Sequence, residues 1–313
     1  IGTHDFVDGD DNVYESSTHG TSVMGTMAGI LPNQLIGTAP GASYYLAITE
    51  DVSSEFVIEE DNWISGAELA DSLGADIIAT SLSYTTFNDP QMDHTYADMN
   101  GQTTRVAIGA GIAATKGMLI VVSAGNYFQQ PWHYIGSPAD AFNILAIGAV
   151  KSDSLHSSFS SAGPSFDGRV KPEIVAQGTQ AISVATNNSG IAQVSGTSFS
   201  GLIIAGISSC LWQAIPEATS LQVRKAIIAS ANQYNNPDDE LGYGIPNYGK
   251  ALLFLNEMVH GKIDSTLLEK NKIFLDAYPI PVSNNLTLIM YSYSENNENG
   301  SLLLYDVNGK LVT

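Results

Sequence analysis

The stretch Ser195-Gly196-Thr197-Ser198-Phe199-Ser200-Gly201 decides the fold, together with the run that follows it to residue 214. Residues 199–214 are apolar on nearly every face of a helix, and Gly201 and Gly206 lie inside the run. A helix that is apolar all round is buried. We therefore predict a central helix, closely approached by its neighbours, with Ser198 at its amino end. A serine in that place is, taken alone, most often an N-cap.

Strands and helices alternate along the rest of the chain up to residue 256. Apolar runs rich in β-branched residues predict strands, and small-residue stretches between them predict helices. Because these strands are apolar throughout, both faces of their sheet should be covered. The pattern predicts an α/β fold with a doubly wound, mostly parallel sheet. The expected buried strands are 44–48, 77–82, 118–123 and 144–150, and the expected helices are 59–73 and 105–116.

The character of the sequence changes after residue 256. Residues 257–272 are mostly polar and predict a linker. Residues 273–313 alternate in the way that strands do, with expected strands over 286–293 and 301–307. We therefore divide the chain into a large domain over 1–256, the linker over 257–272, and a small C-terminal β-sandwich fragment over 273–313 that is cut short.

Acidic residues dominate the charge of the chain. There are 32 Asp and Glu against 12 Lys and Arg, a formal net charge of −20. Such a charge repels phosphate backbones and anionic lipid, so we expect no nucleic-acid partner. A negative net charge favours solubility, and carboxylates can also bind calcium, so the charge alone does not indicate one function. No apolar run is long enough to span a membrane, and Cys210 is expected to be a small buried hydrophobe of the central helix.

Two further segments place polar side chains at the ends of predicted elements. Thr18-His19-Gly20-Thr21-Ser22 opens a helix of small and apolar residues that begins at the histidine. Ser123-Ala124-Gly125-Asn126 ends a buried strand and places an amide at the carboxyl edge of the sheet, where open α/β sheets bind ligands. Each segment alone is more often structural than catalytic. In this order, and together with residues 195–201, they predict a catalytic site.

These three segments resemble the motifs of the subtilase family of serine peptidases. Residues 157–164 and 167–176 resemble the segment that precedes the family's nucleophile, and Leu241-Gly242-Tyr243-Gly244 resembles the end of its catalytic domain. The likeness covers nearly all of the large domain. It implies a subtilisin-like fold and an endopeptidase that cuts peptide bonds through an acyl-enzyme on Ser198.

The chemistry that the resemblance implies is acyl transfer. A serine hydroxyl is a weak nucleophile until a base takes its proton, and an imidazole with a pKa near ~6.5 serves at neutral pH. The resemblance makes Ser198 the nucleophile and His19 the general base. It assigns the oxyanion of the tetrahedral intermediate to the Asn126 side-chain amide and the Ser198 backbone N–H.

The same resemblance implies how substrate binds. The segment Ser81-Leu82-Ser83 corresponds to the strand that pairs with extended substrate, and Ala124 and Gly125 correspond to part of the wall of the pocket for the residue before the cut. Ser83 stands where relatives commonly have glycine. We therefore expect narrower subsites than in broad-acting relatives.

The acidic member of the catalytic triad is missing from the matching segments. In the family it ends the first strand, in Asp-Thr-Gly or Asp-Ala-Gly, well upstream of the histidine, whereas only 18 residues precede His19. Asp5, Asp8, Asp10 and Asp11 lie there, but none follows an apolar strand or precedes the glycine pattern. We expect the aspartate and its strand to lie upstream, so that this chain is N-terminally truncated and poorly active alone.

An acidic turn near the start of the chain offers an alternative use of these residues. Oxygen ligands cluster in Asp8-Gly9-Asp10-Asp11-Asn12, which also fits a calcium loop. A surface turn of this kind needs no ion. We expect no metal and no other cofactor, with calcium as the alternative.

The C-terminal segments carry a second resemblance. Tyr278-Pro279-Ile280-Pro281 and Leu304-Tyr305-Asp306-Val307-Asn308-Gly309 resemble the start of the sorting domain used in type IX secretion. This implies the secretion machinery as a partner and a secreted or cell-surface location. The alternative is a generic β-sandwich appendage.

Two other functions compete with the peptidase. One is a peptidase-like domain that has lost catalysis and holds peptides or a surface partner. The other is an esterase of the α/β-hydrolase type, which needs Gly-x-Ser-x-Gly after a strand, whereas the residues here are Gly196-Thr197-Ser198-Phe199-Ser200. The leading prediction is a secreted subtilisin-like endopeptidase acting on proteins or peptides.

Overall fold

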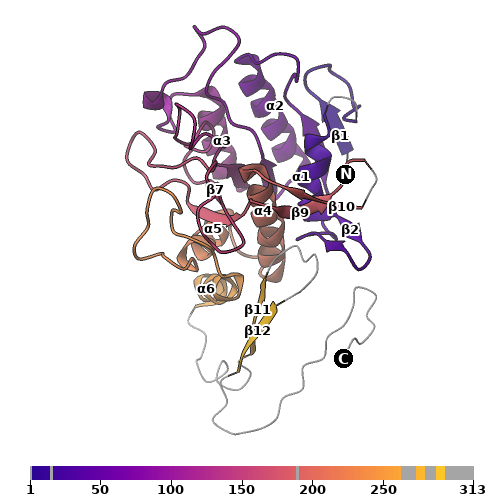
Figure 1. The fold of residues 1–313 in the computed structure, drawn as a ribbon, viewed down its shortest axis with the longest axis vertical. Coiled ribbons are helices and arrows are strands. Elements are labelled where there is room, and N and C mark those ends of the chain that lie inside the picture. The colour runs from indigo at the N-terminus through magenta and orange to yellow at the C-terminus, as the bar shows by residue number, and fades with distance from the viewer. Residues whose placement is uncertain (1, 15–16, 188–189, 262–272, 279–286, 293–313) are drawn as a thin grey trace.

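The structure of the chain, a computed structural model, describes residues 2–14, 17–187, 190–261, 273–278 and 287–292 (Figure 1). Its α-helices are α1 (His19–Ala28), α2 (Ile58–Leu73), α3 (Arg105–Thr115), α4 (Thr197–Ala214), α5 (Ser220–Ala229) and α6 (Tyr248–His260). Its strands are β1 (Gly2–Asp5), β2 (Ile30–Leu31), β3 (Leu35–Ile36), β4 (Tyr45–Ile48), β5 (Ile77–Thr80), β6 (Leu119–Ser123), β7 (Leu145–Val150), β8 (Ile174–Gln177), β9 (Ala181–Val184), β10 (Ile191–Val194), β11 (Ile273–Tyr278) and β12 (Thr287–Ser292). A short 3₁₀ helix spans Tyr96–Asp98.

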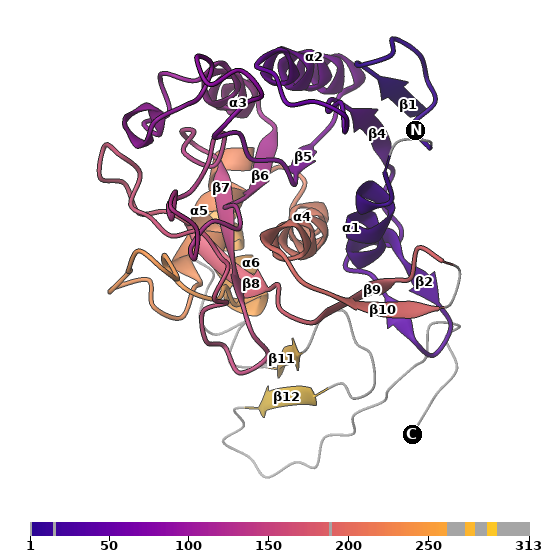
Figure 2. The same ribbon diagram turned by 45° about the horizontal axis from the view of Figure 1, so that its top comes forward.

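The main sheet holds four parallel strands in the order β5-β6-β7-β8. Alternate residues of its central strands enter two different cores. Leu119 and Val121 of β6 pack with side chains of α4, α5 and α6, whereas Ile120 and Val122 pack with those of α2 and α3. Figure 2 shows α2 and α3 on one side of the sheet and α4 and α5 on the other. The predicted doubly wound α/β fold is confirmed.

Helix α4 is the buried central helix that the sequence predicts. It contacts all four strands of the main sheet, and its first ten residues, 197–206, are buried. A Cβ on Gly206 would collide with the Thr38 side chain, so glycine permits that close approach. The N-cap residue is Gly196, which makes the N-cap interpretation of Ser198 wrong.

Cys210 differs from the prediction as well. The sequence predicts a buried hydrophobe, but Cys210 is exposed, and its thiol donates to the Thr38 carbonyl at 3.3 Å. The apolar sequence of the run does not show that one end of the helix is buried and the other is exposed. In the last turns of α4, after Gly206, Ser208 and Leu211 are the buried residues.

Two strands predicted to be buried are partly exposed. Strand β4 alternates between exposed and half-buried residues, and β5 is half-buried at Ile77 and Ile78 and exposed at Ala79, whereas β6 and β7 are buried throughout. Among the described residues, β4 pairs only with β1, and β5 pairs only with β6. Each therefore lies at the edge of its sheet, and a strand needs neighbours on both edges to be fully buried.

The C-terminal part is described in two pieces. Helix α6 continues to His260, into the residues expected to be linker. Strands β11 and β12 pair antiparallel, and β12 lies within the strand expected over 286–293. The strand expected over 301–307 lies outside the described residues, as do most residues of the likeness to a sorting domain. The division into domains stays a prediction.

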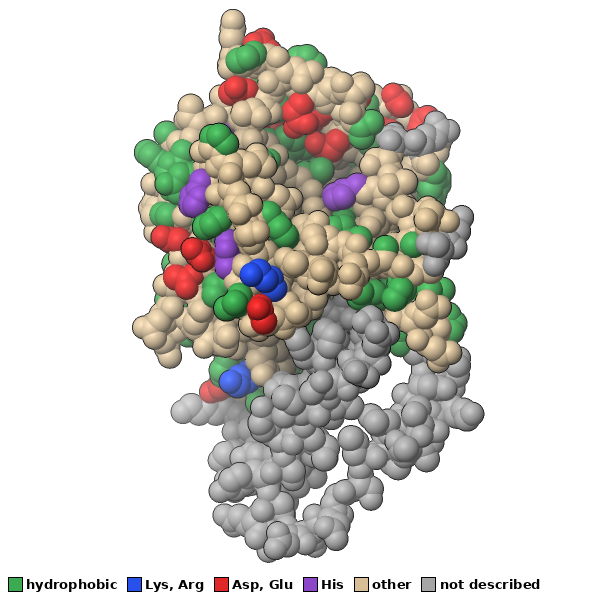
Figure 3. Space-filling model, in the orientation of Figure 1, with side chains coloured by type: hydrophobic (Ala, Val, Ile, Leu, Met, Phe, Trp, Pro, Cys, Tyr) green, Lys and Arg blue, Asp and Glu red, His purple; other side chains and the backbone are tan. Residues whose placement is uncertain are grey.

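The surface agrees with the composition. On the face shown in Figure 3, acidic side chains are more abundant than basic ones. None of the helices in the described part of the chain is long and apolar enough to cross a membrane.

A buried ion network lies at the edge of the sheet where β7 and β8 begin. Lys171 and Glu173 are 1% and 4% exposed, and the Lys171 Nζ lies 2.9 Å from Glu173 Oε1. The Arg224 guanidinium of α5 lies 2.9 Å from the same oxygen, and the Ala146 N–H donates to Glu173 Oε2 at 2.7 Å. One carboxylate thus connects β7, the entry to β8 and α5. Burial lowers the pKa of Lys171, and Glu173 opposes that shift.

Removal of this carboxylate should destabilise the fold strongly. Glu173→Ala leaves the Lys171 ammonium buried without its partner, and breaking a buried pair costs about 3–5 kcal/mol. Urea unfolding measures the change. Glu217→Ala, at an exposed position, is the control and should leave the unfolding midpoint in place. Equal midpoints for the two variants would contradict the structural role of the network.

Candidate active site

An amide at the carboxyl end of β6 is held against the amino end of α4. The Asn126 Oδ1 accepts hydrogen bonds from the Thr197 backbone N–H at 3.0 Å and from the Thr197 hydroxyl at 3.1 Å. A backbone N–H only donates, so the atom facing it must be the amide oxygen. The NH₂ group of Asn126 therefore points the other way, on an exposed side chain, where it can donate to a bound molecule.

Ser198 lies in the first turn of α4, one residue after Thr197. It is 8% exposed, and its carbonyl accepts a hydrogen bond from the Ser81 hydroxyl at 3.2 Å. That bond fixes the helix start against the residue that follows β5. The amino end of α4 carries the partial positive charge of the helix dipole, which favours negative charge beside Ser198. The sequence prediction that Ser198 begins the central helix is confirmed.

His19 is the first residue of α1, as predicted. Helix α1 packs against α4 and β9, and the Ser183 hydroxyl of β9 donates to the Ser22 carbonyl in its first turn. The His19 ring lies 6.4 Å from the Phe199 ring, measured between centroids, with an edge-to-face orientation of 71°. Since Phe199 follows Ser198 directly, the start of α1 lies close to the start of α4. Burial lowers the pKa of His19 below its usual 6.5.

The four aspartates before His19 take other roles in the structure. Asp5 ends β1 and accepts the backbone N–H groups of Val7 and Asp8 at 2.8 and 3.1 Å. Asp10 accepts the Asn12 N–H, and Asp11 lies 3.0 Å from the His4 Nδ1. Within the described residues, none of them forms a hydrogen bond or ion pair with His19. Their rejection as triad acids stays a prediction.

The residues expected to bind substrate converge on the same edge of the sheet. Ser81, Leu82 and Ser83 follow β5, and all three are half-buried. Ala124 and Gly125 follow β6 and are buried, and the Gly125 carbonyl accepts the Ser161 N–H at 3.0 Å. The two segments therefore follow adjacent strands of the sheet. Asn126 comes directly after the second segment.

Tyr127 and Thr197 belong to this site although the sequence analysis did not select them. The Tyr127 hydroxyl donates to the Ser83 carbonyl at 3.1 Å and so bridges the two segments. Its ring fills the space beside Gly125, where an added Cβ would lie only 2.9 Å away. Thr197 orients the Asn126 amide. The only sequence signal for either residue is its position next to Asn126 or Ser198.

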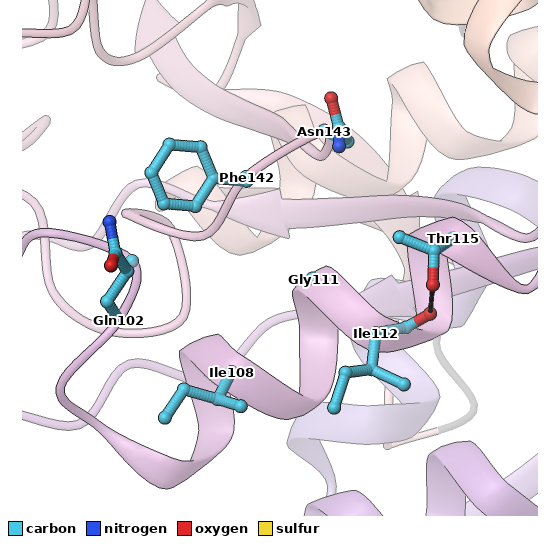
Figure 4. Close-up of a pocket in the computed structure, with 8 residues that line it drawn as sticks. Gln102, Ile108, Gly111, Ile112, Thr115, Phe142 and Asn143 are labelled. Atoms are coloured by element: carbon cyan, nitrogen blue, oxygen red, sulfur yellow. Dashed lines mark hydrogen bonds between the residues drawn. The ribbon is translucent and has the colours of Figure 1, made fainter.

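A shallow hollow elsewhere on the surface is separate from this site (Figure 4). Phe142 and Asn143 contribute to it and come directly before β7, so they lie at the amino edge of the parallel sheet, opposite the edge where β6 leads to Asn126. The other lining residues are uncharged and lie in or near α3: Gly101, Gln102, Ile108, Gly111, Ile112 and Thr115.

Comparison with known proteins gives one consistent family. A family profile described as Peptidase_S8, the subtilase family, matches residues 2–244. Subtilisin DY from Bacillus licheniformis is 28% identical over 249 residues, which cover 78% of this chain and 80% of that protein. Subtilisin E from Bacillus subtilis is 29% identical over 238 residues, which cover 74% of this chain and 55% of that protein. The chain thus spans only about half the length of some curated relatives.

Solved structures share the fold at lower identity. The crystal structure of MycP1 with the N-terminal propeptide removed has a TM-score of 0.62 and 22% identity, and covers 80% of this chain and 84% of that chain. The prenylagaramide maturation protease PagA has a TM-score of 0.62 and 24% identity, and covers 78% of this chain and 84% of that chain. At these identities the likeness concerns the fold.

The protonation of His19 can be tested directly on the chain of residues 1–313. We expect its imidazole to titrate below pH 6.5, because burial disfavours the charged form and no carboxylate of the described residues pairs with it. The imidazole is then neutral, and able to accept a proton, down to a lower pH than a free histidine. The NMR shift of the ring Cε1–H, assigned through His19→Gln, measures this pKa. A value above 6.5 would contradict the described environment.

Proposed function

This chain belongs to the subtilase family of serine-type peptidases, and from that premise we propose that it is a secreted endopeptidase that hydrolyses proteins or peptides through an acyl-enzyme on Ser198. His19 acts as the general base. Asn126 and the Ser198 backbone N–H stabilise the oxyanion. The same proposal requires no cofactor for the chemical step.

The observation that carries this proposal is the pair of hydrogen bonds from Thr197 to the Asn126 Oδ1. They hold the amide oxygen against the start of α4, the helix that bears the serine, and leave the NH₂ on the exposed side of the amide. Preorganised donors aimed at a developing negative charge contribute a large share of the rate of acyl transfer. A purely structural asparagine would need no free donor on an exposed side chain. In a subtilisin, removal of such an amide costs roughly 2.7–4 kcal/mol of transition-state stabilisation. That value was not obtained from this chain.

The proposed reaction follows from these positions. The Ser198 Oγ attacks the carbonyl carbon of the scissile peptide while the His19 imidazole takes its proton. The oxyanion forms between the Asn126 NH₂ and the Ser198 N–H, beside the positive end of the α4 dipole. His19 then gives the proton to the leaving amine, which departs as the C–N bond breaks. Water, activated by the same imidazole, hydrolyses the acyl-enzyme and restores Ser198.

We further propose that the acid that orients His19 lies outside residues 1–313, on a strand that inserts between β4 and β5. Each of these strands has one edge without a strand partner in the described residues, and the apolar Ile77 and Ile78 of β5 are only half-buried. One parallel strand would satisfy both edges and cover those side chains. An aspartate on that strand, paired with the imidazole, would oppose the lowering of the His19 pKa by burial. Loss of such an orienting group costs about 10⁴-fold in kcat.

We also propose export to the medium or the cell surface, through the type IX machinery. The support is the resemblance of residues 278–286 and 304–312 to a sorting domain, and most of these residues lie outside the described parts of the chain. The alternative function, a peptide-binding domain without catalysis, is favoured by one observation: within the described structure, His19 has no carboxylate partner. The experiment below separates the two.

The peptidase proposal is tested on the chain expressed with whatever sequence precedes Ile1 in its gene. We expect a fluorophosphonate probe to label Ser198 and casein to be cleaved, because the probe reacts only with a serine activated by a base. Ser198→Ala should abolish both signals. Ser209→Ala lies on the same helix, where its hydroxyl donates to the Gly206 carbonyl, and should retain them. Peptide binding without labelling or cleavage would establish the non-catalytic alternative.

The packing of Tyr127 predicts which residue is accepted before the cut. A Cβ on Gly136 would lie 3.4 Å from the Tyr127 ring and would collide with the Ser83 hydroxyl. The Tyr127 ring thus fills the space beside both Gly125 and Gly136, and the Ser83 side chain fills the space beside Gly136. We expect a preference for small residues there. Tyr127→Ala should raise kcat/KM for peptides with Phe before the cut, relative to Ala, by roughly tenfold or more.

Peptide substrates that differ only at this residue measure the change. Tyr14→Ala, at a tyrosine that is 79% exposed in the loop after β1, is the control and should keep the wild-type ratio. An unchanged ratio in Tyr127→Ala would exclude the ring as the wall of the pocket.

A further inference from the structure

Three carboxyl groups converge in and after the loop that joins β4 to α2. Glu50 and Glu55 lie in this loop, and Glu59 lies in the first turn of α2. One oxygen of each lies within 4.8 Å of the others. Glu59 is 1% exposed, whereas Glu50 and Glu55 are half-buried, so solvent reaches the group through Glu50 and Glu55. We call these three residues the carboxylate cluster.

One oxygen of the cluster is buried and has no partner. The Glu59 Oε1 accepts the Asp51 N–H at 3.1 Å, but the Glu59 Oε2 has no hydrogen-bond partner. A buried polar atom without a partner is costly, and an ionised one costs more. The neighbouring Glu60 shows the ordinary solution, since its two oxygens accept from the His94 ring at 2.5 Å and the Val106 N–H at 3.1 Å. In the described structure Glu59 therefore has no cationic partner, and its Oε2 has no donor.

No cationic side chain balances the cluster. In the described structure the hydroxyls of Tyr84 and Thr49 donate to Glu50 Oε1 at 2.5 and 2.8 Å, and the Asp51 N–H donates to Glu59 Oε1. The Phe56 N–H is a weaker backbone donor to the Glu59 carboxylate. None of the ion pairs among the described residues includes Glu50, Glu55 or Glu59.

We propose that Glu50, Glu55 and Glu59 bind a divalent hard cation, Ca²⁺, whose remaining ligands are water and nearby backbone oxygens. The cluster offers only oxygen, with no histidine or cysteine, and such sets suit Ca²⁺ and Mg²⁺ rather than Zn²⁺ or Cu²⁺. Oxygens within 4.8 Å of one another can share one ion after small side-chain adjustments. The flexible coordination of Ca²⁺ allows this more readily than the near-ideal octahedron that Mg²⁺ demands. The ion gives Glu59 Oε2 the partner that it lacks.

The site lies directly behind the segment that is proposed to bind substrate. Tyr84 follows Ser83, is 1% exposed, and its hydroxyl donates to Glu50. Its backbone pairs with Ser137 in both directions, at 2.8 and 3.3 Å. A bound ion would hold Glu50, and through it Tyr84, in place. Tyr84 is therefore a positioning residue for residues 81–83, whereas binding of the ion itself does not depend on peptidase activity.

Ion binding is tested on the chain expressed with the sequence that precedes it in its gene. Terbium is the probe, because Tb³⁺ occupies calcium sites and is excited by a nearby phenol such as that of Tyr84. We expect sensitised Tb³⁺ emission that Ca²⁺ displaces. Glu59→Gln and Glu55→Gln should each weaken Ca²⁺ by at least about tenfold, since affinity follows the number of ligand charges. Glu68→Gln, exposed on the same helix, should match the wild type.

Thermal unfolding with and without Ca²⁺ separates ion binding by the cluster from a purely structural role of its carboxylates. With EDTA, Glu59→Gln should unfold at or above the wild-type midpoint, because one buried charge is gone. With millimolar Ca²⁺ the order should reverse, because only the wild type gains binding energy. Glu55→Gln, at a half-buried position, should show the same reversal and serves if Glu59→Gln fails to fold. A wild type without Tb³⁺ emission, or variants that respond to Ca²⁺ like the wild type, would overturn the proposal.

Discussion

The arrangement of the site depends on one contact, the hydrogen bond of 3.0 Å from the Thr197 N–H to the Asn126 Oδ1. It joins the end of a buried strand to the start of the buried helix and decides which atom of the amide faces outward. Neither side can shift independently, because α4 packs against all four strands of the sheet and β6 is buried throughout. Packing in the core therefore fixes the position of the proposed oxyanion site, although the Asn126 side chain itself is exposed.

The central elements were predictable because their chemistry is local. The apolar run of α4, the buried strands β6 and β7, and the helix that begins at His19 all appear where the sequence predicts them. Exposure was less predictable. Residues such as Ile77 and Cys210 have apolar surroundings in sequence, but their burial depends on which element lies beside them, and no local pattern carries that information.

The site was predictable only in part, for a related reason. His19, Ser198 and Asn126 were selected through motifs, and the structure brings their segments together. Thr197 and Tyr127 act through contacts with residues far away in sequence, at Asn126 and Ser83. The carboxylate cluster was missed because Glu50, Glu55 and Glu59 resemble any acidic stretch of a chain with net charge −20. Only the structure shows that Glu59 is buried without a partner for one oxygen. In the acidic turn at residues 8–12, Asp10 accepts the Asn12 N–H and Asp11 pairs with His4.

The central claim, that Ser198 forms an acyl-enzyme, is tested most directly by mass spectrometry of the intact protein during turnover. The protein, expressed with the sequence that precedes Ile1 in its gene, is quenched in acid while it hydrolyses a peptide ester. We expect a species heavier by the mass of the acyl group, with the adduct mapped to Ser198 after digestion. Turnover without an adduct, or an adduct on another residue, would contradict it.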